Sequence, residues 1–225
     1  MTRTWSVETG VGQVSACLDG PAGAGKGCAV ILAHGAGGHM TDGGMAAVTS
    51  QLGKHGFTVV RFNFRYREKG SRRPDPMPVL QECMAAVVDS ARKRVHPRRW
   101  IIGGRSMGGR AASMLAADGF ACDGVLLLAY PLHPAAAVDK IRDAHLARIG
   151  APVLCLNGTR DALCRRDLMD AVVARLGDNF TMHWIEDADH AFRVRKASGR
   201  SEAGVLDEIG AAVDAWYTAR VKAAR

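Results

Sequence analysis

The sequence predicts an α/β fold in which a mostly parallel, twisted β-sheet is covered by helices on both faces. Short apolar runs of strand length alternate with segments of helical periodicity, which is typical of parallel strands joined by helical crossovers. The chain has 225 residues, of which 48% are hydrophobic, enough for one domain with a substantial core. Because no linker, internal repeat or change of composition divides it, we expect residues 1–225 to form a single domain.

The first part of the chain is expected to lie outside the alternating pattern. Residues 4–18 alternate loosely between apolar and polar side chains around Gly10 and Gly12, which predicts an antiparallel hairpin. Residues 20–27 are similar to a phosphate-binding loop, but Gly27 stands where that loop needs a hydroxyl for Mg²⁺. An apolar strand also follows where such a loop needs a helix, so we expect a flexible turn and no nucleotide site.

Strands and helices are expected to alternate from there to the C-terminus. The expected strands are residues 28–33, 57–62, 99–103, 124–129, 152–157 and 180–185. Apolar side chains at helical spacing predict helices within residues 45–52, 78–91, 107–115, 168–176 and 205–216. Residues 63–78, with four arginines and three prolines, are expected to be a long irregular loop, and residues 138–149 a short or irregular helical crossover.

The composition excludes several classes of function. The formal net charge is +8, but the basic residues are spread along the chain. Their densest cluster, residues 92–94 with Arg98 and Arg99, falls at an expected helix end, where cations are favourable. No nucleic-acid recognition module accompanies the charge, so we expect no nucleic-acid partner.

Hydropathy and cysteine usage predict a protein of the cytoplasm. No apolar run approaches the roughly 18 residues of a membrane span, and the first residues carry no apolar signal-peptide segment, so no membrane association is expected. The six cysteines are scattered without a C-x-x-C pair, which favours reduced, buried thiols and no metal site.

One motif carries recognisable chemistry. Gly104-Arg105-Ser106-Met107-Gly108 fits G-x-S-x-G, the pattern that holds a serine on a sharp turn between a strand and a helix. An expected strand precedes this motif and an expected helix follows it. The glycines are needed because the serine backbone and the helix pack too closely for a side chain.

The residues that follow the other strands supply partners for this serine. Asp161 and His190 each follow an expected strand, and active groups gather beyond the carboxyl ends of parallel strands. The order serine, aspartate, histidine is that of the α/β-hydrolase triad. We therefore expect Ser106 as nucleophile, His190 as general base and acid, and Asp161 as the group that orients His190. The backbone N–H groups of Met107 and Ala36 are expected to form the oxyanion hole.

Alternatives to these assignments exist. Asp161 competes with Asp167, Asp187 and Asp189, and is preferred because it follows a strand directly. His183 competes with His190 but lies within a strand, where a surface or cross-strand position is expected. Residues that are candidates for lining the pocket are His34, Gly35, His39, Arg105 and His133. Arg105 has two expected orientations, toward the pocket or away against a carboxylate such as Glu68. We expect solvent-exposed loop positions for four further arginines, Arg65, Arg67, Arg72 and Arg73. The alternative is that they attract an anionic substrate.

Several short segments together resemble a known family. They are HGAGGHMTD (34–42), RFNFRYRE (61–68), RPDP (73–76), GGRSMGGR, YPLHP, NGTRD and DADHAF. The combination resembles the small α/β-hydrolases grouped with testis-expressed protein 30 and the hydrolase-like part of the third NSL chromatin-complex subunit. These proteins are distantly similar to dienelactone hydrolases. The resemblance implies an α/β-hydrolase fold of reduced size, carries Ser106, Asp161 and His190 over as triad positions, and implies that HGAGG is the oxyanion loop. Arg65 stands where bacterial relatives more often have proline.

These observations predict a serine hydrolase that acts on a small-molecule carboxylic ester or thioester through an acyl-enzyme, with no cofactor, as a monomer or homodimer. The insertion between Ala129 and Pro152 is short, so a reduced or absent lid and an open cleft are expected. The alternative is a non-catalytic interaction protein that uses the same fold, as the chromatin-associated relatives suggest. The retention of all three triad positions favours the enzyme.

Overall fold

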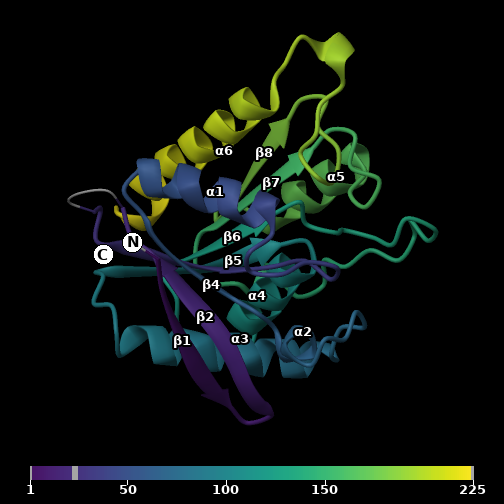
Figure 1. The fold of residues 1–225 in the computed structure, drawn as a ribbon. Helices are drawn as coiled ribbons and strands as arrows, with labels where there is room; N and C mark the ends of the chain where they lie inside the picture. Colours follow the sequence, from purple (N-terminus) through teal and green to yellow (C-terminus); the bar gives the residue numbers. More distant parts are fainter. Residues whose placement is uncertain (1, 22–24, 224–225) are drawn as a thin grey trace.

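A computed structural model describes residues 2–21 and 25–223, and these form an eight-stranded sheet with helices on both faces (Figure 1). The strand order is β1-β2-β4-β3-β5-β6-β7-β8. Strand β2 pairs antiparallel with β1 and β4, and every pairing from β4 to β8 is parallel. The mostly parallel α/β architecture is therefore confirmed.

The N-terminal hairpin has the expected form. Strands β1 (Thr2–Thr9) and β2 (Gly12–Asp19) pair along their whole length. Residues 22–24 of the expected turn lie outside the described residues. The next described element is strand β3. A phosphate-binding loop would be followed by a helix, so the expectation that this segment is not such a loop agrees with the structure.

The parallel strands lie close to their expected positions. They are β3 (Cys28–Ala33), β4 (Thr58–Phe62), β5 (Arg99–Arg105), β6 (Gly124–Leu128), β7 (Val153–Gly158) and β8 (Phe180–Ile185). All residues of β3, β6 and β7 are buried, because helices cover both faces of the sheet at its centre. Strand β6 ends one residue early, since Ala129 takes a left-handed backbone conformation with φ of 51°.

The helices form two layers, each with its own apolar core. On one face α1 (Gly43–Lys54) packs beside α6 (Glu202–Trp216). The other face is covered by α3 (Met77–Arg92), α4 (Met107–Ala117) and α5 (Arg166–Leu176) (Figure 1). A π-helical turn, η3 (Tyr217–Val221), extends α6 and buries Tyr217 and Val221.

The connection after β4 differs from expectation. The long loop after β4 contains a single helical turn, α2 (Arg65–Glu68), in which the Tyr66 ring is buried. The β6–β7 connection, expected to be a short or irregular helical crossover, contains a single 3-10 turn, η1 (Leu146–Arg148). Backbone carbonyl groups of this connection accept hydrogen bonds that are not helical. The Tyr130 hydroxyl donates to Arg142 O at 2.6 Å, and Arg142 N donates to Leu132 O at 2.8 Å.

The segment between Ala129 and Pro152, all of it described, thus holds no helical lid over the carboxyl ends of the strands. Among the helices of the described residues, none has the length and apolar character needed to cross a membrane. All six cysteines are free thiols, and five of them are buried.

Candidate active site

Ser106 lies on the sharp turn between β5 and α4. Its backbone has φ of 52°, a left-handed conformation that costs a non-glycine residue about 1–3 kcal/mol. A β-carbon on Gly104 would lie 2.6 Å from Ala33 O, and one on Gly108 would lie 2.6 Å from His34 O. The two glycines of the motif are therefore required by the close approach of β5, α4 and the end of β3.

The structure brings Ser106, His190 and Asp161 together in one hydrogen-bonded chain. His190 Nε2 lies 3.0 Å from Ser106 Oγ, and His190 Nδ1 lies 2.8 Å from Asp161 Oδ2. The three residues follow β5, β8 and β7, whose carboxyl ends lie at the same edge of the sheet. A carboxylate beside Nδ1 favours the tautomer with its proton on that nitrogen, which leaves Nε2 free to accept the serine proton.

The Asp161 carboxylate is fixed by more than its contact with His190. Its side chain is fully shielded from solvent, Leu163 N donates to Oδ1 at 2.8 Å, and Asn157 Nδ2 donates to Oδ2 at 3.1 Å. Asn157 is itself anchored, because its Oδ1 accepts from Tyr130 N at 3.0 Å. Sequence reasoning assigned no role to Asn157, although an asparagine at the end of a wholly buried strand was a usable signal.

The loop that follows β3 packs against the serine turn. A β-carbon on Gly35 would lie 3.5 Å from Ser106 Cβ, so the two backbones are close. Gly35 O accepts from Gly38 N at 2.9 Å, and the trans peptide directs the N–H of Ala36 the opposite way. The Tyr66 hydroxyl donates to Ala36 O at 2.7 Å and fixes the next peptide. Within the described residues, the N–H groups of Ala36 and Met107 have no hydrogen-bond acceptor.

The histidines near the strand ends support loops. His34 is fully buried, with Nδ1 donating to Gly35 O at 2.8 Å and Nε2 accepting from Phe64 N at 3.1 Å. His133 is also buried, and its Nε2 accepts from Arg165 N at 3.1 Å, which ties the segment after β6 to the loop that carries Asp161. His39 bonds Thr41 and Asn63 within its own loop.

We expect His34 to make the stability of the fold depend on pH. Burial lowers the pKa of His34 from 6.5 to about 4. Above pH 6.5 the ring is neutral in both states, whereas between pH 6.5 and 4 the unfolded chain binds a proton that the folded ring does not. The free energy of unfolding therefore falls as the pH falls through this window, by about 3 kcal/mol in total.

Urea unfolding of the wild type and His34→Gln between pH 7 and 4.5 measures this effect. The variant keeps an amide for hydrogen bonding but has no proton to gain, so its stability is expected to change less with pH. His145, whose pKa burial also lowers to about 4, is present in both proteins and cancels in the difference. Equal pH dependence in the two proteins would contradict the prediction.

The alternative acids and the alternative base form hydrogen bonds with residues other than Ser106 and His190. Asp167 is exposed and bonds Arg165, while Asp187 binds Arg195. Asp189 accepts from Ala191 N at 2.7 Å and Arg193 N at 3.0 Å, so it stabilises the turn that follows His190. His183, on β8, bonds Glu208 at 2.9 Å.

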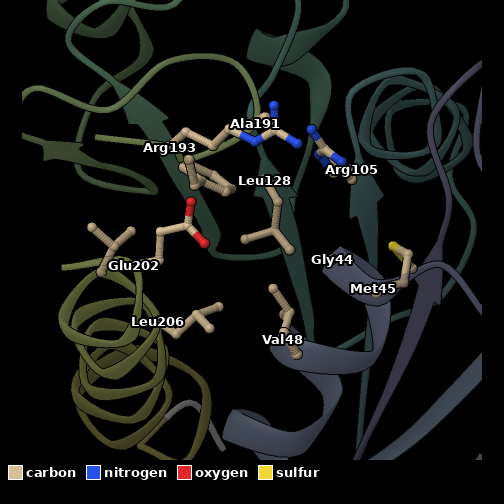
Figure 2. Close-up of a pocket in the computed structure, with 13 residues that line it drawn as sticks. Gly44, Met45, Val48, Arg105, Leu128, Ala191, Arg193, Glu202 and Leu206 are labelled. Atoms are coloured by element: carbon tan, nitrogen blue, oxygen red, sulfur yellow. The ribbon is translucent and has the colours of Figure 1, made fainter. Parts of the chain in front are cut away.

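A pocket of about 300 Å³ lies between α1, α6 and the turn after His190 (Figure 2). Arg105 and Ala191, the sequence neighbours of Ser106 and His190, line it, whereas Ser106, His190 and Asp161 do not. Its apolar walls include Val48, Leu128 and Leu206, and its charged residues are Arg105, Arg193 and Glu202. Of the five residues considered for a pocket lining, Arg105 lines this pocket; His34, Gly35, His39 and His133 do not. Arg193 and Glu202 were not anticipated.

The Arg105 side chain takes the first of its two expected orientations. Its Nη2 donates to His190 O at 3.1 Å. Glu68 is not its partner, because the Glu68 carboxylate accepts from Ser15 N at 2.9 Å and Asn63 Nδ2 at 3.1 Å. Arg105 therefore links the serine turn to the backbone of the catalytic-histidine candidate. Arg65, Arg67, Arg72 and Arg73 do not line the pocket.

In the part of the chain that the structure describes, no group of three or more His, Cys, Asp or Glu side chains is arranged to hold a metal ion.

Comparisons with known proteins identify the fold. The model of the family described as "Alpha/beta hydrolase domain" matches residues 26–218. An alpha-beta serine hydrolase homologue from Coxiella burnetii superposes with a TM-score of 0.75 at 21% identity, covering 95% of this chain and 96% of that one. A lidless α/β serine hydrolase from Xanthomonas campestris gives 0.77 at 20% identity, covering 96% and 94%. Dienelactone hydrolase from Anabaena variabilis gives 0.73 at 19% identity, covering 98% of both chains. At these identities the likeness shows the fold.

Proposed function

The chain belongs to the alpha/beta hydrolase domain family, and on that premise we propose that it is a serine hydrolase cleaving carboxylic esters or thioesters. The observation that carries the proposal is the unbroken hydrogen-bonded chain from Ser106 through His190 to Asp161. It lies where the close approach of glycine backbones holds the serine on a strained turn. This arrangement suits a nucleophile that is activated by an adjacent base.

The reaction begins with transfer of the Ser106 hydroxyl proton to His190 Nε2 as Oγ attacks the acyl carbon. Collapse of the tetrahedral intermediate breaks the bond to the leaving alcohol or thiol, which takes the proton from Nε2. Water then attacks the acyl-enzyme in the same way, and the carboxylic acid leaves with Ser106 regenerated. Throughout, Asp161 holds the imidazole in place and stabilises its charged form.

Two backbone N–H groups act on the negative charge of the intermediate. They belong to Met107, the first residue of α4, and to Ala36 in the loop after β3. Both are without an acceptor in the described residues, and Tyr66 fixes the peptide beside Ala36. Each donor of this kind is typically worth about 3 kcal/mol of barrier.

The site favours small substrates that enter from solvent. Residues 129–152 place no helical lid over Ser106, so no interfacial activation is expected. Within the family we place the chain with the group of testis-expressed protein 30 because of its combined HGAGG, GGRSMGGR and NGTRD segments. We further propose that it works as one domain in the reducing cytoplasm, since all six of its thiols are free.

Labelling with a fluorophosphonate probe tests the proposal. The wild type is expected to be labelled on Ser106, because the probe reacts with a serine that an adjacent base activates. Ser106→Ala is expected to remain unlabelled, and heat-denatured wild type is the control for non-specific reaction. An unlabelled wild type, or equal labelling of the variant, would remove the hydrolase proposal and favour a non-catalytic interaction protein.

A further inference from the structure

The pocket that Arg105 lines has two arginines at one end. The guanidinium groups of Arg105 and Arg193 point toward one another at one end of it (Figure 2). Among the described residues, no carboxylate oxygen lies within ion-pair distance of either group. Two neighbouring cations repel one another, and an anion placed between them would offset that repulsion.

Arg105 also has unused hydrogen-bonding capacity. Its Nη2 is occupied by His190 O, but its Nε is shielded from solvent and has no partner. Burial has the largest effect on the pKa of Arg105 and lowers it, Asp189, Asp42 and Asp161 raise it, and Arg193 lowers it by a smaller effect. A buried guanidinium donor without a partner is costly, so this donor is available to a ligand.

We propose that Arg105 and Arg193 together bind a carboxylate that the ester substrate carries near the bond being hydrolysed. This inference rests on the proposed function and specifies its substrate as an acidic ester. Arginine suits the role because its planar fork donates two parallel hydrogen bonds to a carboxylate. The position suits it as well, since Arg105 precedes Ser106 and Arg193 follows His190 by three residues.

The rest of the pocket limits where the anion lies. Val48, Leu128 and Leu206 form an apolar wall for the hydrocarbon part of the substrate. Glu202, at the start of α6, brings a negative charge to the same pocket and makes no ion pair with either arginine. The first-turn N–H groups of α1 at Gly43 and Gly44 have no intrahelical acceptor and lie on the Arg105 side, where a Gly44 β-carbon would be 3.7 Å from Arg105 Nη1. The carboxylate therefore belongs at the arginine end.

Matched pairs of esters test the inference. The ratio of kcat/KM for the acidic ester to kcat/KM for the neutral ester is compared between variants, because a substitution that impairs both reactions equally leaves this ratio unchanged. Mono-4-nitrophenyl glutarate is compared with 4-nitrophenyl pentanoate for a carboxylate on the acyl side. Sodium 4-acetoxybutyrate is compared with butyl acetate for one on the alcohol side. The wild type is expected to prefer the acidic member of one pair by its kcat/KM. Arg193→Gln is expected to lower that preference about tenfold or more, the size of a lost charged hydrogen bond.

Arg72→Gln is the matched control, because it removes the same charge from an exposed residue that does not line the pocket. It is expected to keep the wild-type preference. Absence of preference in both pairs, or equal ratios in Arg193→Gln and Arg72→Gln, overturns the inference while fluorophosphonate labelling leaves the hydrolase proposal standing.

A binding measurement separates the inference from catalysis. Calorimetric titration of the Ser106→Ala protein with monomethyl glutarate is expected to show binding that weakens about tenfold when Arg193→Gln is added. Monomethyl glutarate that binds equally well to both proteins contradicts the inference. Weakened binding supports the carboxylate site even if the wild type fails to react with the fluorophosphonate probe.

Discussion

Replacing His190 with alanine is expected to lower kcat toward 4-nitrophenyl acetate about 10⁶-fold, the size of the loss that removal of a triad histidine causes in a serine protease. The physical reason is that Ser106 Oγ lies 3.0 Å from Nε2 and has no other base within reach among the described residues. Without the imidazole, the hydroxyl keeps its proton at neutral pH and attacks poorly. KM is expected to change much less, because His190 acts on the proton and not on substrate binding.

The control for this variant is His183→Ala, which removes the histidine that lies on β8 and bonds Glu208. We expect it to keep kcat within a few-fold of the wild type. The two variants are compared by initial rates after circular dichroism confirms that each is folded. Comparable losses in both, or a folded His190→Ala protein with substantial activity, would contradict the assigned general base.

The fold and the proximity of the three proposed triad residues were predictable from the sequence because both depend on local patterns. Apolar runs of strand length identify the parallel strands, and a residue after each run must lie at the carboxyl edge. This rule alone placed Ser106, Asp161 and His190 near one another, and the structure joins them by hydrogen bonds. The need for glycine on both sides of Ser106 was predictable for the same reason, since the spacing of these glycines indicates a tight local turn.

Features that depend on contacts between distant segments were not predictable. The short helix α2 forms where the sequence reads as a loop, because Tyr66 is buried and Glu68 accepts from Ser15 N on β2. The orientation of Arg105 is set by the backbone of His190, 85 residues later in the chain. The pocket exists because α1 packs beside α6, two helices at opposite ends of the sequence. No periodicity within a single segment carries such information.

Asn157 is an instructive intermediate case. It lies at the end of a buried strand, close to the edge where the predicted active residues lie, but its side chain acts through another residue. It connects Tyr130, at the end of β6, to the Asp161 carboxylate. Sequence position identified the edge of the sheet where it lies, while the partner it supports became visible only in three dimensions.

Asp161→Asn is expected to lower kcat about 10⁴-fold while leaving the fold intact, a loss of the size that the same change causes in other triads. The hydrogen bonds around Asp161 explain why an isosteric change has so large an effect. Leu163 N donates to Oδ1 at 2.8 Å, so the asparagine keeps its oxygen at that position and turns its amide nitrogen toward His190. His190 Nδ1 must then accept a hydrogen bond from that amide, so the neutral ring carries its proton on Nε2 and cannot take the proton of Ser106.

The same geometry gives the variant a second, structural signature. In the wild type, Asn157 Nδ2 donates to Asp161 Oδ2 at 3.1 Å. In the variant an amide nitrogen takes the place of Oδ2, so two hydrogen-bond donors face one another in a buried site. We expect a loss of stability of about 1–3 kcal/mol in urea unfolding, the cost of one unsatisfied buried donor.

Asp167→Asn is the matched control, since Asp167 is exposed and bonds Arg165, and it is expected to change neither kcat nor stability appreciably. If Asp167→Asn lowers kcat as much as Asp161→Asn does, the assignment of Asp161 to the triad is wrong. If instead Asp161→Asn retains wild-type kcat, the acid that orients His190 lies elsewhere, and Asp189 in the adjoining turn becomes the next residue to replace.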